Sequence, residues 1–304
     1  MDVRRLRLLR DLSVYGTVAA TAEALHLSGP AVSQQLATLE KEAGVPLLAK
    51  HGRTLRLTPA GRLVVEHAEV ILGGLAAAEA DLKALRAGGR GTVRVAAFPS
   101  AARGLLPTVW RRVADAEVDL HLTELEPEAA VTALRQRAVD IAIVHAYSLL
   151  PLDLIVGCDQ HRLLDEDVLL ALHPRHGLVS GESVDLARFS GERWLMPGPA
   201  TSCHELTRRA CGAAGFVPRP IALASDFSVL IALVAVDAGV ALVPRMALPA
   251  ATDGVTLHPL AQPVTRTILA LTATGDQRQP HLRRVLDELR AAASPPRPSD
   301  VPVR

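Results

Sequence analysis

The chain has 304 residues, enough for two or three domains, and its formal net charge of +1 alone argues against a nucleic-acid-binding protein. A hydrophobic fraction of 49% with 21% charged residues excludes a wholly disordered chain, and 3% aromatics leaves a core of mainly leucine, valine and alanine. The charge is uneven, because residues 1–62 hold 9 Lys and Arg against 5 Asp and Glu, whereas the remainder holds 24 against 27.

The cysteines and the hydropathy indicate the compartment. Cys158, Cys203 and Cys211 are odd in number and form no CxxC pair, so neither a disulfide framework nor a zinc site is expected. The chain opens without an apolar signal sequence, and its longest apolar run, Val229–Val243, contains Asp237 and is shorter than the ~20 residues of a membrane span. We therefore expect a soluble, cytoplasmic protein with no membrane partner.

The N-terminal segment predicts two short helices joined by a tight turn. Thr17 is a good N-cap for a helix over residues 18–25. Ser28 can cap a second helix that tolerates Pro30 in its first turn and ends near Ala43, before Gly44. This arrangement is typical of a helix-turn-helix.

The second helix has two distinct faces. Its buried stripe follows helical spacing through Val32, Leu36, Leu39 and Ala43. The opposite face is small and polar and consists of Pro30, Ala31, Gln34, Thr38 and Lys41. Such a face fits the major groove of DNA, where glutamine can pair with adenine and methyl groups can touch thymine. The alternative is an ordinary solvated helix face.

A small hairpin over residues 47–57 follows and carries cations around Gly52. Lys50, His51, Arg53 and Arg56 suit a wing that contacts the phosphate backbone, although a solubilising loop remains the alternative. Thr58-Pro59 then supplies an N-cap and first-turn proline for one long helix over residues 59–87.

The long helix carries an apolar seam with alternating four- and three-residue steps. Its members are Val64, Ala68, Ile71, Leu75, Ala78, Leu82 and Leu85. A seam of three heptads is long enough for a helix–helix dimer contact. Packing against its own domain is the alternative.

From Thr92 onward, short Val/Ile/Leu runs alternate with helical stretches, which predicts an α/β region with parallel sheets. The expected strands are 93–98, 118–125, 141–144, 194–196, 221–223, 240–243 and 268–271. The expected helices are 103–115, 128–138, 202–214, 226–238 and 280–293. The proline-rich residues 293–304 are expected to be a disordered tail.

Residues 1–62, which we call the head, resemble the winged helix-turn-helix of LysR-type transcriptional regulators. Residues 19–40 (AATAEALHLSGPAVSQQLATLE) resemble its helix-turn-helix, and residues 55–61 (LRLTPAG) its wing and linker-helix start. The resemblance assigns recognition to Ala31, Ser33, Gln34, Gln35 and Thr38. The N-terminal end of the helix and the charged wing add Ser28, Pro30, Lys50, Arg53 and Arg56 as expected DNA contacts. The chain departs from the family at Gly29, where glutamine is common, so one DNA contact is expected to be missing.

The resemblance also implies a fold and partners. It implies a winged helix-turn-helix (1–58), a linker and dimerisation helix (59–89), and an effector domain (90–292) like the type-2 periplasmic binding proteins. Lobe one would comprise residues 92–161 and 267–292, and lobe two residues 162–266. The expected partners are double-stranded DNA at an interrupted palindrome near a promoter, a small-molecule effector, and further copies in a homodimer or homotetramer.

Three strand-to-helix turns are expected to line the effector cleft, because helix N-termini at the carboxyl ends of strands favour anions. Family resemblance places contacts at the first two turns, and the third qualifies by position. Together they supply Ser100, Ala101, Thr201, Ser202, His204, Asp226 and Phe227. His204 and Asp226 could equally be helix-cap or first-turn residues. The scarcity of aromatics favours a polar or anionic effector.

Other polar residues give weaker indications. His145 follows a strand and could face the cleft, but a structural role is the simpler interpretation. His173 and His176 lie in a loop and are not expected to bind metal. Glu124, Glu126 and Glu128 alternate around a strand end and are interpreted as a solvated edge rather than an acid/base pair.

No enzyme motif occurs, since GxSxG, P-loop, HExxH and strand-linked GxGxxG patterns are absent, and no cofactor is expected. The sequence thus favours a ligand-responsive, DNA-binding transcription factor. Two alternatives stay open: an enzyme or binding protein with an incidental helical head, and a non-specific DNA-architecture protein, which the small excess of positive charge disfavours.

Overall fold

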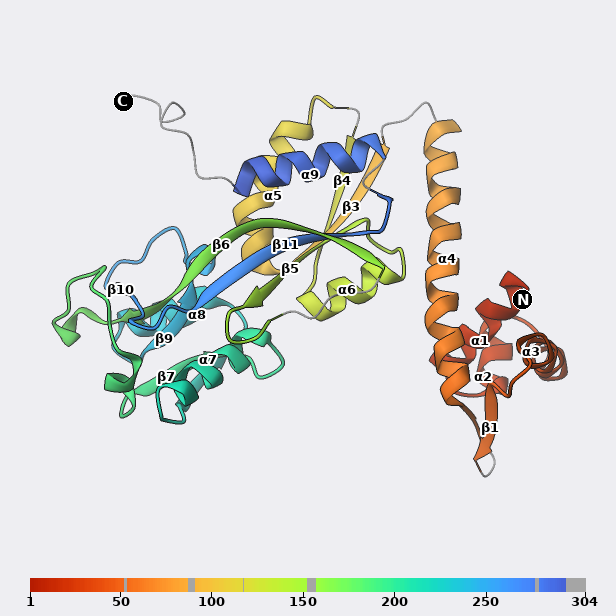
Figure 1. The fold of residues 1–304 in the computed structure, drawn as a ribbon, viewed down its shortest axis with the longest axis horizontal. Coiled ribbons are helices and arrows are strands. Elements are labelled where there is room, and N and C mark those ends of the chain that lie inside the picture. The colour runs from red at the N-terminus through yellow and green to blue at the C-terminus, as the bar shows by residue number, and fades with distance from the viewer. Residues whose placement is uncertain (52–53, 87–90, 117, 152–156, 277–278, 294–304) are drawn as a thin grey trace. The chain divides into compact units, whose positions relative to one another are not determined.

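The computed structural model describes residues 1–51, 54–86, 91–116, 118–151, 157–276 and 279–293 (Figure 1). The chain divides into two compact units. One comprises Met1–Gly91 with Thr132–Ala138, and the other comprises Thr92–Val131 with Val139–Arg304. The first holds the helix-turn-helix and the second holds the α/β region.

The first unit opens with three helices, α1 (Val3–Tyr15), α2 (Val18–Ala24) and α3 (Gly29–Ala43). The hydroxyl of Thr17 accepts a hydrogen bond from the Ala20 amide, and that of Ser28 accepts one from the Ala31 amide, so both act as N-caps. Gly44 ends α3 with φ of 70°, a left-handed conformation that favours glycine. These caps lie at the residues that the sequence predicted.

A hairpin and a long helix complete this unit. Strands β1 (Leu48–His51) and β2 (Thr54–Leu57) pair antiparallel, and α4 runs over Pro59–Arg86. Thr58 caps α4 by accepting from the Gly61 amide at 3.0 Å, while its hydroxyl donates to the Pro46 carbonyl at 2.8 Å. A Cβ at Gly61 would lie 2.1 Å from the Leu47 carbonyl oxygen, so only glycine fits there.

One apolar core holds the elements of the head together. It combines α1, α2 and α3 with the start of the wing and of α4. Its buried members are Leu6, Leu8, Leu9, Leu12, Ala22, Val32, Leu36, Leu39, Leu47, Val65 and Ala68. The stripe predicted for α3 therefore faces this core, with Val32 and Leu39 fully buried.

The second unit is built on a seven-stranded sheet with the order β10-β6-β11-β5-β3-β4, and β9 pairs with β6 on the edge opposite β10. The strands are β3 (Gly91–Ala97), β4 (Val118–Glu124), β5 (Ile141–Tyr147), β6 (Cys158–Leu172), β9 (Ala241–Pro244), β10 (Thr256–Pro259) and β11 (Thr265–Ala273). Strands β7 (Arg193–Pro197) and β8 (Arg219–Ala224) form a separate parallel pair. Figure 1 shows β6 and β11 side by side along this unit.

Helices cover these sheets and define three cores. They are α5 (Pro99–Val113), α6 (Pro127–Arg135), α7 (Ser202–Ala213), α8 (Phe227–Ala235) and α9 (Pro280–Ala293), with short 3-10 helices η1 (Pro174–His176), η2 (Leu186–Phe189) and η3 (Arg245–Ala247). One core joins α5 and α9 to β3, β4 and β5, and we call this part lobe one. The other two pack α7 and α8, respectively, against β7, β9 and the end of β6, and we call this part lobe two.

Several expectations from the sequence need correction. Parallel pairing holds for β3 with β5 and for β7 with β8, but β6 and β11 pair antiparallel with each other and with their other neighbours. Strands β6 and β10 were not predicted, and α5 begins at Pro99 rather than at residue 103. The expected disordered tail lies outside the described residues beyond Ala293.

Among the described residues, no helix combines the length and the hydropathy needed to cross a bilayer.

Candidate functional site

The outward face of α3 is the first candidate surface. Ser33, Gln34 and Gln35 are exposed, and Ala31 and Thr38 are half-buried, on the helix that buries Val32, Leu36 and Leu39 beneath them. Ser28 and Pro30 are exposed at the N-terminal end. The arrangement leaves a small polar surface on a rigidly packed helix.

Two of these polar side chains have partners within the head. The Nε of Arg5 donates to the Gln35 side-chain oxygen at 2.9 Å, and Arg5 also forms an ion pair with Glu42. The Thr38 hydroxyl donates to the Gln34 carbonyl at 2.9 Å. Gln35 thus holds α1 against α3, whereas no side-chain partner is recorded for Ser33 or Gln34 among the described residues.

The wing is anchored to α3 by one carboxylate. The Oε1 of Glu40 accepts from the backbone amides of Leu47 and Leu48 at 2.8 and 2.9 Å. In the hairpin, Lys50 pairs with Leu55, and the side chain of Arg56 is exposed. Arg53 and the side chain of Lys50 lie outside the described residues, as does the side chain of His51.

Gly29, the departure from the family pattern, lies in open space. It begins α3, and no atom lies within 4 Å of where its Cβ would be. No close packing therefore demands glycine at this position. A longer side chain there would not collide with the rest of the head.

The predicted seam of α4 splits into two parts. Ala68 is fully buried in the core of the head and Val64 packs against that core. Further along, Ile71, Leu75 and Leu82 are 46%, 42% and 54% exposed. The first turns thus pack against their own domain, whereas the later seam presents apolar side chains without cover; the side chain of Leu85 lies outside the described residues.

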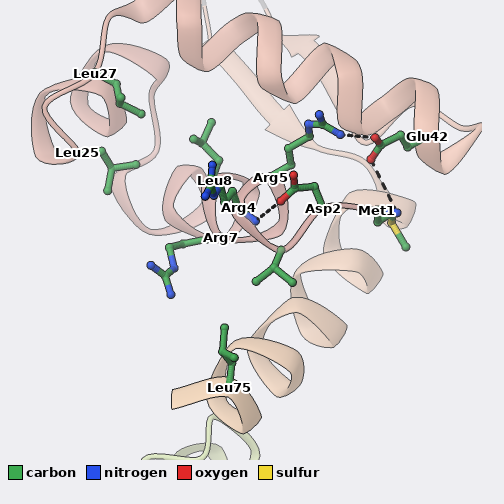
Figure 2. Close-up of a pocket in the computed structure, with 11 residues that line it drawn as sticks. Met1, Asp2, Arg4, Arg5, Arg7, Leu8, Leu25, Leu27, Glu42 and Leu75 are labelled. Atoms are coloured by element: carbon green, nitrogen blue, oxygen red, sulfur yellow. Dashed lines mark hydrogen bonds and ion pairs between the residues drawn. The ribbon is translucent and has the colours of Figure 1, made fainter. Parts of the chain in front are cut away.

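An open depression of about 930 Å³ lies beside this exposed seam (Figure 2). Its apolar part includes Leu25, Leu27 and Leu75, and the start of α1 adds Arg4 and Arg7. Figure 2 shows Leu75 on α4 below α1, and Arg7 extending from α1 above it. The surface combines apolar contact area with cations.

A cleft of about 430 Å³ in the second unit is the second candidate site. Its volume is in the range typical of small-molecule pockets. Residues from both lobes line it, namely Phe98, Pro99, Ser100, Arg103, Glu124, Glu126, His145, Cys203, Ser225, Asp226, Phe227, Ala247 and Arg266. It thus lies where ligands are expected in open α/β sheets, at helix N-termini beyond strand ends.

Arg266 is the most deeply buried of the charged residues that line this cleft. Its side chain is 1% exposed, and its Nε donates to Glu166 Oε1 at 2.6 Å. One Nη donates to the Ser100 hydroxyl at 3.2 Å, and the guanidinium lies 5.2 Å from the centre of the Phe98 ring. The buried cation is therefore neutralised by Glu166 and ties β11 to the start of α5.

His145 connects the lobes. It lies on β5 and its Nε2 is 2.8 Å from the hydroxyl of Ser202, the first residue of α7. Burial, assisted by the charge of Arg266, lowers the pKa of His145 to about 3, so the imidazole is neutral near pH 7. Its Nδ1 is buried and has no hydrogen-bond partner among the described residues.

A second pair makes the same connection between β5 and α7. The Tyr147 hydroxyl lies 2.8 Å from the Cys203 thiol, and both side chains are buried. Burial raises the pKa of both groups, so each is protonated at neutral pH. These two polar pairs fix the N-terminus of α7 against lobe one.

The structure places the predicted effector residues in different surroundings. Ser100, Asp226 and Phe227 line the cleft. Ala101 is instead fully buried in the core of lobe one. Thr201, Ser202 and His204 are not among the lining residues: Thr201 caps α7, Ser202 contacts His145, and the Nδ1 of His204 lies 2.9 Å from the Pro197 carbonyl oxygen.

Arg266, Arg103 and Cys203 also line the cleft, although the sequence did not predict them there. A signal for Arg266 was present, because strand alternation places it on the same face as Ile268 and Ala270, both fully buried. A charged residue at an inward position requires a partner, which is Glu166 on the neighbouring strand. That partner could not be read from the sequence, since β6 was not predicted.

The described residues contain no group of three His, Cys, Asp or Glu that could hold a metal ion. His173 caps η1 by accepting from the Arg175 amide, and the His176 ring lies 5.9 Å from that of Phe189. Both histidines therefore have structural surroundings.

Two family descriptions match the chain. Residues 3–62 match "Bacterial regulatory helix-turn-helix protein, lysR family", and residues 86–294 match "LysR substrate binding domain". The second match alone spans more than half of the chain. The first includes α1 to α3 and the wing, and the second includes every residue that lines the cleft.

Individual relatives agree with these matches. The chain is 29% identical over 249 residues to the HTH-type transcriptional regulator CatR of Pseudomonas putida, covering 80% of this chain and 83% of that protein. It is 25% identical over 281 residues to the DNA-binding transcriptional dual regulator OxyR of Escherichia coli, covering 89% and 88%. Full-length CbnR in complex with its target DNA has a TM-score of 0.60 at 24% identity, covering 96% of this chain and 100% of that one.

Proposed function

We propose, from the premise that the chain belongs to the LysR family of DNA-binding transcriptional regulators with an effector-binding domain, that the exposed face of α3 reads its operator. The observation that carries this proposal is the polar surface of Ser33 and Gln34 on a helix whose opposite face closes the core of the head. Gln34 is the candidate for base contact, because a glutamine amide can pair with adenine in the major groove. Ser28, Pro30, Ala31, Ser33 and Thr38 would support it through phosphate and methyl contacts.

The wing supplies the backbone contacts in this proposal. Lys50, Arg53 and Arg56 carry positive charge on the hairpin that Glu40 anchors to α3. Contacts to phosphates release counterions, so DNA binding should weaken steeply with salt. Gln35 is assigned a different role, since Arg5 already occupies its side-chain oxygen.

The exposed part of α4 pairs two copies of the chain. Ile71, Leu75 and Leu82 repeat at heptad-like spacing on one side of the helix and are left uncovered in a single chain. Burial against a second copy would remove this apolar surface from water. A twofold dimer presents two copies of α3 to two half-sites, which accounts for an interrupted palindrome as the target.

The cleft around Arg266 is the proposed effector site, and its effect on DNA is a shift between conformations. A ligand that touches Ser100 of lobe one and Asp226 of lobe two favours whichever arrangement of the lobes brings these residues closer. The free-energy difference between the two arrangements is what would change DNA affinity or activation. We further propose that the protein has no enzymatic activity and acts in the cytoplasm, where its DNA target lies.

Peroxide sensing, which the names of some relatives describe, is not part of this proposal. Cys203 is buried and its thiol pKa is raised, whereas a peroxide-reactive cysteine needs an accessible thiolate. Cys211 lies eight residues further along the same helix, about 12 Å away at 1.5 Å per residue, too far for a disulfide.

The proposed function is tested by DNA affinity at several salt concentrations. We expect the full-length chain to bind a duplex from the region flanking its own gene, and Gln34→Ala to weaken this binding by about tenfold or more. Arg56→Ala should weaken all sequences alike and reduce the slope of log affinity against log salt by about one. Asp253→Asn, an exposed change in the second unit, is the control. Equal affinities in all four proteins would refute the assigned DNA surface.

A further inference from the structure

The charges that line the effector cleft are mainly negative. Glu124, Glu126 and Asp226 face two arginines, Arg103 and Arg266. Arg266 is already neutralised by Glu166, which lies opposite it on the neighbouring strand and is itself buried. An anionic effector would therefore meet an excess of negative charge in this cleft.

The second arginine is also engaged. One Nη of Arg103 donates to the backbone carbonyls of Met246, Ala247 and Leu248, at 3.3, 2.9 and 3.2 Å. Its charge also lowers the pKa of Asp226, after the hydrogen bonds that the Asp226 side chain accepts from Ser228. In the balance of charge among the lining residues, Arg103 offsets Asp226, which leaves Glu124 and Glu126 in excess.

These two carboxylates lie together without a cation of their own. Glu124 ends β4 and Glu126 precedes α6, and neither has a recorded hydrogen bond or ion pair in the described part of the chain. Both side chains are exposed, yet the partial burial of Glu126 raises its pKa, repulsion by Glu124 raises it further, and the charge of Arg266 acts in the opposite direction. A positive group placed between Glu124 and Glu126 would offset their mutual repulsion and lower the pKa of Glu126.

A separate observation concerns His145, which lines the same cleft. His145 is 5% exposed, lines the cleft, and leaves its Nδ1 without a partner among the described residues. A buried polar atom in this state is costly unless a water or ligand satisfies it. The N-terminus of α5, beside it, also lacks a side-chain cap at Phe98.

We propose that the effector carries a cationic nitrogen, which binds between Glu124 and Glu126 while the rest of the molecule reaches His145 and the start of α5. This inference rests on the proposed function, in which this cleft is the effector site. It reverses the preference for an anion that the low aromatic content suggested. A carboxylate elsewhere on the same ligand stays compatible, because the uncapped helix N-terminus accepts negative charge.

The cation is organic rather than a metal ion. The described residues offer no set of three metal-binding side chains, whereas the cleft holds about 430 Å³. Phe98 and Phe227 in the lining add apolar surface for a carbon skeleton. An amine or amino acid matches this combination of apolar wall and paired carboxylates.

The test is binding by the full-length protein to probes that differ in charge. Putrescine, L-lysine and the other L-amino acids form the cationic arm, succinate and glutarate the anionic arm, and Mg²⁺ the metal arm, each measured by calorimetry and thermal shift. We expect binding in the cationic arm, and Glu126→Gln and Glu124→Gln each to weaken it by about tenfold. Asp253→Asn, an exposed carboxylate outside the cleft, should leave it unchanged.

Two outcomes would overturn the inference: binding confined to the anionic or metal arm or absent from every arm, and a loss in the glutamine variants no larger than in Asp253→Asn. DNA affinity measured on the same samples separates this failure from failure of the proposed function. A protein that binds DNA specifically but responds only to anions refutes the cationic ligand alone. A protein without specific DNA binding refutes the proposed function.

Discussion

Arg266 and Glu166 form a buried ion pair between neighbouring strands, with side chains that are 1% and 5% exposed. Glu166 also accepts from the Met246 amide at 2.5 Å, so one carboxylate holds β11 and η3 together. Burying two charges is costly, and the cost is offset only when the pair is closely matched. The pair therefore belongs to the architecture of the cleft, and removing one member leaves the other uncompensated.

Replacing Arg266 by methionine should lower the free energy of unfolding by about 3–5 kcal/mol, because the Glu166 carboxylate would remain buried without its cation. Urea unfolding followed by circular dichroism measures this. Arg208→Met is the matched control, since Arg208 lies 3.9 Å from Glu205 on the surface and should contribute under about 1 kcal/mol. Similar losses in both variants would show that the pair is not structurally important.

His145 should make stability depend on pH in a defined window. Its pKa falls from 6.5 to about 3 on folding, chiefly through burial, so below pH 6.5 the unfolded chain binds a proton that the folded chain does not. The free energy of unfolding should therefore decrease as the pH falls from 6.5 toward 3, by up to about 1.4 kcal/mol per pH unit, and should not change from this cause above pH 7.

The measurement compares the slope of stability against pH, between about pH 7 and pH 5, in His145→Gln and in the parent protein. The variant should have the shallower slope, whatever its absolute stability. His121→Gln, at an exposed histidine of β4, should keep the parental slope. A parental slope in His145→Gln would contradict the assignment of a buried, neutral imidazole.

The three thiols should differ in reactivity. Burial raises the pKa of Cys211 to about 12 and also raises that of Cys203, whereas Cys158 is half-buried on β6. A thiol reagent such as DTNB should modify Cys158 first and reach the other two only on unfolding. Peroxide should leave DNA affinity unchanged, and rapid modification of Cys203 in the native protein would count against its buried, protonated state.

Gly29 offers a gain-of-contact test on α3. Because no atom lies within 4 Å of its Cβ position, Gly29→Gln should fold normally and increase DNA affinity by restoring the contact common in the family. Gly29→Ala, which changes helix propensity without adding a polar group, separates the two causes. Equal affinities for both variants, measured by fluorescence anisotropy, would mean that the glutamine contact adds nothing here.

Local signals predicted the head well. Thr17, Ser28 and Gly44 are capping residues whose side chains or conformations act within a few residues, so the helix ends could be read directly. The stripe of Val32, Leu36 and Leu39 likewise depends only on helical spacing. The environment of the α4 seam was harder to predict from the sequence. Helical spacing places Ala68 and Leu75 on one stripe, but it does not show that Ala68 packs inside the head while Leu75 remains exposed.

Long-range pairing explains what was missed in the cleft. Strand β6 contains Asp165, Glu166 and Asp167 in succession, which conceals the alternation of a strand. The antiparallel register that brings Glu166 opposite Arg266 arises only when segments 100 residues apart meet. Thr201, Ser202 and His204 were placed near the cleft by their turn, but their side chains are occupied by capping and by contacts with Pro197 and His145.

The most direct test of the account is the DNA sequence that the protein selects. Full-length protein and its Gln34→Arg variant would each be incubated with a random duplex library, and the bound sequences determined. Glutamine pairs with adenine and arginine with guanine in the major groove. We predict two symmetry-related half-sites in which one preferred adenine becomes guanine in the variant. An unchanged consensus that both proteins bind equally well would contradict the reading of DNA by α3 in a twofold dimer.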